Sequence, residues 1–268
     1  MHFFMGMLLY KQGDNYMQTL ILSSSFKTYN KDNEGNRVPR IIDNVNGFLD
    51  NLKKLLTKRK CMVVILGDPK RTRKGDPEFI TKESFKMSGI SFDEYVFVDE
   101  SNMQNIKEYV KKADCINLFG GHLPTANTFI NELNLKEHIQ DYDGLIIGAS
   151  GGAMNMADNV YCIPEVEGEH VDKSFKRILK GLALTDVSII PHYQFFENFV
   201  FGDGVRMMED VILADSYKNS LIGLVDGSYI IQNGNKIEIF GEAYLVENGK
   251  IEMINKKDSV VELKVGEK

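Results

Sequence analysis

Short apolar runs alternate along the chain with longer segments in which apolar residues recur every three or four positions. The apolar runs are residues 18–24, 61–68, 95–98, 115–119 and 144–147. Continuous runs of this length are typical of parallel strands that are buried on both faces, and the segments between them have the spacing of amphipathic helices. This rhythm predicts an α/β fold, a doubly wound and mostly parallel sheet with helices on both faces in a flavodoxin-like three-layer arrangement.

The predicted helices of this first part cover residues 41–56, 81–88, 102–113 and 125–137. Further helices are expected at residues 173–180 and 202–214, the second with Asp203 as its N-cap. From residue 221 onward, short strands separated by Asn-Gly and similar turns predict a β meander whose hairpins extend the parallel sheet at one edge. Because no repeat, low-complexity tract or linker divides the sequence, we expect one domain over residues 1–268.

Composition narrows the function classes. With 43% hydrophobic and 26% charged residues, the chain has the material for a sizeable core. A net charge of -6 argues against nucleic-acid and anionic-membrane partners, because phosphate contacts need a basic face. The apolar residues 2–10 lack the basic flank and cleavage site of a signal peptide and are too few to span a bilayer, so we expect a cytoplasmic protein. The three widely spaced cysteines suggest neither disulfides nor a metal site, and we expect no cofactor.

The pentapeptide GASGG at residues 148–152 directly follows the apolar run 144–147 and precedes good helix formers. A serine on a sharp turn between a buried strand and a helix is a nucleophile elbow, and glycines two positions before and after it let strand and helix approach closely. Ser150 is therefore the candidate nucleophile. The alternative interpretation is an ordinary turn in which this serine caps the helix.

A serine hydroxyl needs a base within hydrogen-bond reach and backbone donors for the developing oxyanion. His192 follows the predicted strand 187–191, at the end where open α/β sheets place catalytic groups. His122 also follows a strand end, so position alone leaves it open as the base. The backbone N–H groups of Gly151, after the serine, and Gly121, in the neighbouring glycine loop, are candidates for the oxyanion hole.

Several motifs occur in a characteristic order: FGGH at residues 119–122, NTF at 127–129, GASGGA at 148–153, IPHY at 190–193 and LIGLVDGS at 221–228. Over most of its length the chain resembles the peptidase E and cyanophycinase family, the S51 serine peptidases. The resemblance implies a class I glutamine amidotransferase-like fold and activity on small peptides or aspartyl linkages. It further implies Ser150 as nucleophile, His192 as base, and Gly121 and Gly151 as oxyanion donors.

The resemblance leaves the acid of the triad open. Family patterns offer an acidic residue after the elbow helix, which is Glu165 here, and another in the segment that contains Asp226; Asp158 is a weaker third candidate. The sequence differs from the family pattern at two positions, one in the glycine loop that bears on substrate binding and one in the turn after Ser150. The glycine loop carries His122 where asparagine or aspartate is usual, and Gly151 replaces the alanine that usually follows the serine.

Arg206 lies where members that cleave after an N-terminal aspartate carry an arginine for the acidic side chain. A guanidinium can grip a carboxylate through two parallel hydrogen bonds, so Arg206 and His122 are the candidate substrate-binding residues. The alternative for Arg206 is a solvated position on an amphipathic helix. The basic cluster at residues 70–74 could also attract acidic substrates.

The sequence thus predicts a serine peptidase, a dipeptidase-like amide hydrolase that cleaves short, aspartate-containing peptides through an acyl-enzyme without metal or cofactor. The alternative is a non-catalytic ligand-binding or regulatory protein with a glutamine amidotransferase-like fold. A glutaminase-type amidotransferase needs a cysteine at the elbow, where this chain has Ser150. We expect a small peptide as the substrate, and the assembly is left open between a monomer and a homodimer.

Overall fold

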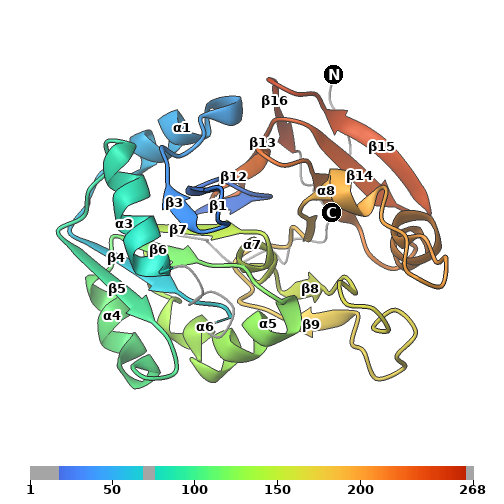
Figure 1. The fold of residues 1–268 in the computed structure, drawn as a ribbon, viewed down its shortest axis with the longest axis horizontal. Coiled ribbons are helices and arrows are strands. Elements are labelled where there is room, and N and C mark those ends of the chain that lie inside the picture. Colours follow the sequence, from blue (N-terminus) through green and yellow to red (C-terminus); the bar gives the residue numbers. More distant parts are fainter. Residues whose placement is uncertain (1–17, 69–75, 264–268) are drawn as a thin grey trace.

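The computed structural model describes residues 18–68 and 76–263. The apolar residues 2–10 and the basic cluster 70–74 lie outside the described residues. The main sheet has eight strands in the order β16-β13-β12-β1-β7-β6-β4-β5 (Figure 1). Five of them pair in parallel: β1 (Thr19–Ser23), β4 (Cys61–Ile65), β5 (Glu94–Val98), β6 (Cys115–Leu118) and β7 (Leu145–Ala149).

The C-terminal meander divides between two sheets. Three of its strands extend the main sheet beyond β1 in antiparallel pairing, as predicted: β12 (Tyr229–Asn233), β13 (Lys236–Phe240) and β16 (Val260–Leu263). The other meander strands are β11 (Leu221–Leu224), β14 (Ala243–Glu247) and β15 (Lys250–Asn255), and together with the earlier strand β10 (Ile189–Ile190) they form a second sheet of four strands. The prediction that the hairpins extend one sheet was therefore only partly right.

Two short hairpins complete the strands of the described chain. They pair β2 (Tyr29–Lys31) with β3 (Arg37–Pro39) and β8 (Asn159–Tyr161) with β9 (Ile178–Lys180).

Helices cover both faces of the parallel strands, which confirms the predicted three-layer architecture. Successive side chains of a strand point to opposite faces, and in β4 Val63 and Ile65 enter one apolar cluster whereas Met62 and Val64 enter the other. One cluster is closed by α1 (Phe48–Leu55) and α3 (Pro77–Met87). The opposite cluster is closed by α4 (Ile106–Lys112), α5 (Leu123–Glu132), α6 (Leu135–His138) and α7 (Gly151–Met154).

Two predicted helices were wrong or misplaced. Residues 173–180 form a turn and then β9, because β8 supplies that segment with a strand partner, with Val160 opposite Leu179. The helix expected from residue 202 begins only at Met207, with Arg206 as its N-cap. It has π-helical turns over Met207–Ile212 and continues as α9 (Leu213–Asp215). Asp203 is therefore not the N-cap, and its carboxylate bonds to His170 instead.

The remaining helical segments are short. Two single 3-10 turns, at Val45–Gly47 and Met103–Asn105, lead into α1 and α4, and α8 covers Tyr193–Phe196. Within the described residues, no helix combines the length and the apolar character needed to cross a bilayer.

Candidate active site

The carboxyl ends of three adjacent strands bring the predicted nucleophile Ser150 and the glycine loop together. Ser24 follows β1, Gly120 and Gly121 follow β6, and Ser150 follows β7, and these strands lie side by side in the main sheet (Figure 1). Ligands of open α/β sheets bind at this edge, because the loops that leave neighbouring parallel strands meet there.

Ser150 has the strained backbone of a nucleophile elbow, with φ 51° and ψ −125°. Its N–H donates to the Ser23 carbonyl at 3.0 Å, which ties the turn to β1. A Cβ on Gly148 would lie 2.6 Å from the Ala153 nitrogen, and a Cβ on Gly152 would lie 2.0 Å from the Leu118 carbonyl oxygen. Both glycines are thus required by the close approach of helix α7 to β6 and β7, as the sequence predicted.

His192 presents its ring to Ser150 from the loop after β10. Its Nε2 lies 3.0 Å from Ser150 Oγ, and its Nδ1 lies 2.6 Å from Asp226 Oδ1. Because a carboxylate can only accept hydrogen bonds, Nδ1 carries a proton and donates it to Asp226. In the neutral imidazole, the lone pair of Nε2 then faces the serine hydroxyl. This is the arrangement that a general base for Ser150 requires.

Asp226, between β11 and β12, is the carboxylate that the structure places behind His192. Its Oδ1 also accepts hydrogen bonds from Ser25 Oγ at 2.8 Å and Ser24 Oγ at 3.0 Å. Partial burial raises the pKa of this carboxyl, but hydrogen bonds from His192, Ser25 and Ser24 and the charge of His192 outweigh burial and hold the pKa well below its usual range. Asp226 is therefore ionised at neutral pH.

Three polar residues of this site were missed from the sequence. Ser24 and Ser25 bond to Asp226, and the Gln194 side chain accepts a hydrogen bond from the Asp226 N–H at 3.1 Å. The sequence offered one indication of Ser24 and Ser25, which is that two serines directly follow the first core strand. Nothing in the sequence shows that this strand end meets a loop two hundred residues further on.

Gly121 and Gly151 lie against each other beside the serine. A Cβ on Gly151 would lie 3.2 Å from the Gly121 oxygen and 3.6 Å from the Gly121 nitrogen. Gly121 has φ 148°, and a Cβ there would lie 2.6 Å from the Asp68 Cβ, so a side chain is excluded. Among the described residues, neither N–H donates to a backbone carbonyl. Within this part of the chain, the N–H groups of both predicted oxyanion donors are thus free of a backbone carbonyl partner.

Glu165 and His122 are connected through Glu169 rather than through Ser150. His122 Nε2 lies 2.9 Å from Glu169 Oε1, and the other oxygen of Glu169 accepts hydrogen bonds from the N–H groups of Glu165 and Val166. His122 Nδ1 lies 3.0 Å from Thr125 Oγ1. His192 therefore meets Asp226, not Glu165, and His122 is joined to the loop of Glu165 rather than to Ser150.

Comparison with known proteins identifies the family. The model of peptidase family S51 matches residues 45–240, which include the elbow, His192 and Asp226. The chain belongs to peptidase family S51. It is accordingly a serine-type peptidase, as the motif order indicated.

Solved structures with the same fold include peptidases from two organisms. A peptidase from an acI-B1 Actinobacterium has a TM-score of 0.63 at 14% identity, with 92% of this chain and 97% of that chain covered. A putative peptidase E protein from Listeria monocytogenes EGD-e has a TM-score of 0.54 at 15% identity, with 89% and 99% covered. No curated protein matches the sequence significantly.

Arg206 of this S51 peptidase is engaged by a neighbouring carboxylate. Its Nη2 and Nε lie 2.8 and 3.0 Å from the two oxygens of Asp210, and the arginine side chain is 54% exposed. The ion pair lowers the pKa of Asp210 to about 2, mainly through the hydrogen bonds from Arg206. A substrate carboxylate would therefore have to compete with Asp210 for the guanidinium.

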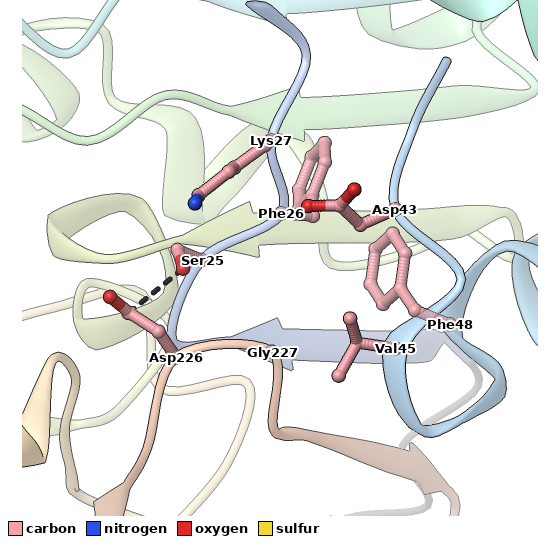
Figure 2. Close-up of a pocket in the computed structure, with 8 residues that line it drawn as sticks. All are labelled: Ser25, Phe26, Lys27, Asp43, Val45, Phe48, Asp226 and Gly227. Carbon is pink, nitrogen blue, oxygen red and sulfur yellow. Dashed lines mark hydrogen bonds between the residues drawn. The ribbon is translucent and has the colours of Figure 1, made fainter. Parts of the chain in front are cut away.

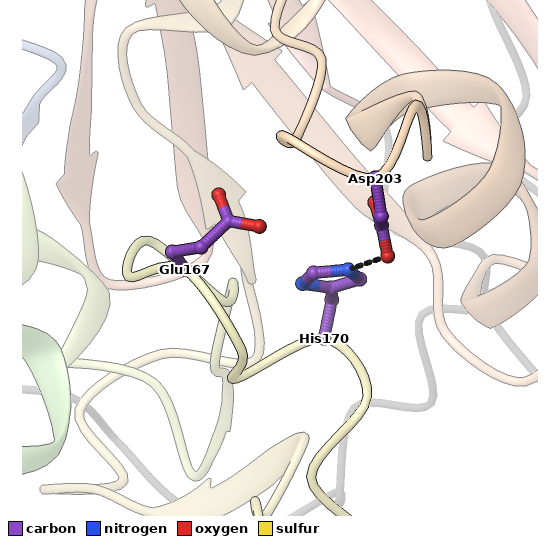
Figure 3. Close-up of side chains that lie close together, drawn as sticks. All are labelled: Glu167, His170 and Asp203. Atoms are coloured by element: carbon purple, nitrogen blue, oxygen red, sulfur yellow. Dashed lines mark hydrogen bonds and ion pairs between the residues drawn. The ribbon is translucent and has the colours of Figure 1, made fainter.

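A second cluster of metal-ligand types lies away from the triad. Glu167, His170 and Asp203 each offer an atom within 4.8 Å of the others (Figure 3). The side chain of His170 is 3% exposed. Its ring stacks on that of Phe201 with the ring centroids 3.7 Å apart, and its Nε2 lies 2.8 Å from Asp203 Oδ2. Glu167 accepts a hydrogen bond from the Gly202 N–H. These contacts fasten the loop of residues 165–172 to the loop before the π-helical segment.

A shallow hollow opens beside Asp226. Figure 2 shows Ser25 and Asp226 turned toward each other at one end of the hollow, with Lys27 above Ser25, and the stacked rings of Phe26 and Phe48 at the other end. The Asp226 side chain is 38% exposed. Water can therefore reach the acid and Ser25 from this side.

The thiols of the peptidase take no part in the site. All three cysteines are buried, and burial raises the pKa of Cys61 to about 11 and of Cys162 to about 12. A thiolate nucleophile is therefore unavailable at neutral pH.

Proposed function

We propose that this peptidase cleaves short peptides through an acyl-enzyme on Ser150. The observation that carries the proposal is the chain of contacts at the elbow, with Ser150 Oγ 3.0 Å from His192 Nε2 and His192 Nδ1 2.6 Å from Asp226. The neutral imidazole takes the serine proton as Oγ attacks the peptide carbonyl. Asp226 fixes the tautomer of the imidazole and stabilises the imidazolium that forms.

The oxyanion of the tetrahedral intermediate is held by the N–H groups of Gly121 and Gly151. These amides flank the serine, and the second stands at the start of helix α7. The imidazolium then protonates the leaving amine, and the peptide C–N bond breaks to leave the acyl-enzyme. Water attacks the ester with His192 again as base, and the acid product leaves with Ser150 restored.

The preference for an acidic substrate rests on Arg206. Its guanidinium already binds a carboxylate in the two-bond geometry that an aspartate side chain would use. We propose that a substrate carboxylate exchanges with that of Asp210. The non-catalytic alternative requires a serine without a base or a histidine without an acid, and the contacts of His192 speak against it.

The test uses purified protein and a panel of dipeptides with aspartate or alanine at the first position. The Ser150→Ala variant should stay folded, but its kcat should be at least about 10³-fold lower than that of wild type, because removal of the serine abolishes nucleophilic attack. A serine-directed phosphonate should label wild-type protein at Ser150 alone, as mapped by mass spectrometry. Hydrolysis that persists in Ser150→Ala, or labelling at another serine, would refute the mechanism.

A further inference from the structure

The Ser24 hydroxyl connects the two partners of the nucleophile. It accepts a hydrogen bond from the backbone N–H of His192 at 2.7 Å and donates one to Asp226 Oδ1 at 3.0 Å. The direction of the bonds is fixed, because a carboxylate only accepts and a backbone N–H only donates. The single hydroxyl oxygen of Ser24 thus contacts both the backbone of His192 and the carboxylate that orients the His192 ring.

The backbone of His192 is in a conformation that a hydrogen bond from its N–H helps to stabilise. His192 has φ 54° and ψ 36°, a left-handed conformation that is unfavourable for a residue with a side chain. It also precedes helix α8, where the first N–H groups have no partner within the helix. The Ser24 oxygen satisfies that N–H, and the Ser24 N–H bonds to the Ser228 carbonyl at 3.1 Å, close in sequence to Asp226.

We propose that Ser24 is a positioning residue for the reaction, which sets the His192 ring between Asp226 and Ser150; this rests on the function proposed above. The burial of Ser24 means that only its own hydroxyl can make these two hydrogen bonds. Ser24 is 0% exposed, so no water can replace its hydroxyl, and its loss leaves the His192 N–H without a partner. Ser25 bonds to the same oxygen of Asp226 but faces the hollow in Figure 2, where water can take its place.

The chain provides a matched control one residue away. Ser23 is also 0% exposed, but within residues 18–68 and 76–263 its hydroxyl has no hydrogen-bond partner. Substitution of serine by alanine at residues 23 and 24 therefore removes the same hydroxyl from two buried positions, one without and one with hydrogen bonds. The volume change is identical, so the difference between the two variants reports the hydrogen bonds of Ser24.

The experiment compares these variants by dipeptide kinetics, thermal unfolding and proton NMR of the His192 Nδ1–H resonance, assigned with His192→Gln. We expect Ser24→Ala to lower kcat about 10- to 100-fold with KM nearly unchanged, as for a lost hydrogen bond to charged partners. The Nδ1–H resonance should shift or broaden in Ser24→Ala and stay unchanged in Ser23→Ala. Ser23→Ala should keep kcat within about 3-fold of wild type, and Ser24→Thr, which keeps the hydroxyl, should recover activity and the resonance.

Equal losses in Ser23→Ala and Ser24→Ala, or an unchanged Nδ1–H resonance in folded Ser24→Ala, would overturn the proposal. If Ser24→Ala does not fold, Ser24→Cys provides the test, because its weak S–H donor should give a partial loss of kcat and a shifted resonance. The NMR measurement needs no substrate. A wild-type protein that neither hydrolyses dipeptides nor reacts with the phosphonate would refute the peptidase mechanism, whereas the resonance would still report whether Ser24 positions His192.

Discussion

Gly152 is the position at which the elbow is least tolerant of a side chain. An added Cβ would lie 2.0 Å from the Leu118 oxygen and 2.6 Å from the Leu118 carbon. Neither atom can move aside, because Leu118 lies in β6 between Ile65 of β4 and Gly148 of β7. Overpacking of a rigid site costs typically 1–3 kcal/mol, and a backbone collision this close belongs at or above the upper end. We expect Gly152→Ala to lower the free energy of unfolding by about 3 kcal/mol or more.

Gly151→Ala is the matched control in the same helix. Its Cβ would lie 3.2 Å from the Gly121 oxygen, a tight contact that a small shift relieves, and alanine favours a helix over glycine by roughly 0.5–1 kcal/mol. The two effects nearly cancel, so we expect a change within about 1 kcal/mol.

Thermal unfolding followed by circular dichroism separates the two variants. At about 2–4 °C per kcal/mol for a chain of this size, Gly152→Ala should lower Tm by about 6 °C or more, and Gly151→Ala should change it by less than about 4 °C. A Gly152→Ala protein that unfolds at the wild-type temperature would show that helix α7 does not approach β6 as described. Equal losses in both variants would show that the cost is not the Leu118 contact.

Two further predictions concern charged groups. Folding lowers the pKa of Asp226, so the carboxylate stabilises the folded protein above its unfolded pKa of about 3.9, and this stabilisation is lost as the folded carboxyl protonates. In urea unfolding, Asp226→Asn should therefore be less stable than wild type above about pH 4. The difference in stability should shrink as the pH falls further. A difference that grows toward acid pH would contradict this assignment. Arg206→Ala should lower kcat/KM for aspartyl dipeptides at least about 10-fold relative to alanyl dipeptides, and Asp210→Asn, which releases the guanidinium, should raise it; equal effects on both substrates would remove Arg206 from recognition.

The parts of the fold that the sequence predicted well are those with local causes. The uninterrupted apolar run of β4 marks a strand covered on both faces, and the glycines around Ser150 mark a turn where backbones touch. Predictions failed where a distant partner decided the local structure. Residues 178–180 became a strand because β8 lies beside them, and Asp203 was drawn to His170 rather than to a helix N-terminus.

By itself, the sequence determined the three-layer architecture and marked Ser150 as the candidate nucleophile, because apolar periodicity and the strand–turn–helix setting are properties of neighbouring residues. Position along the chain left the base open between His192 and His122. Only the tertiary structure decided the acid and its supports. Glu165 and Asp226 fit the motif order equally well, and the choice depends on which carboxylate reaches His192 Nδ1. Ser24 bonds to a backbone 168 residues away. This contact joins the end of β1 in the main sheet to the loop after β10 in the second sheet, so it forms only in the folded chain and no local pattern encodes it.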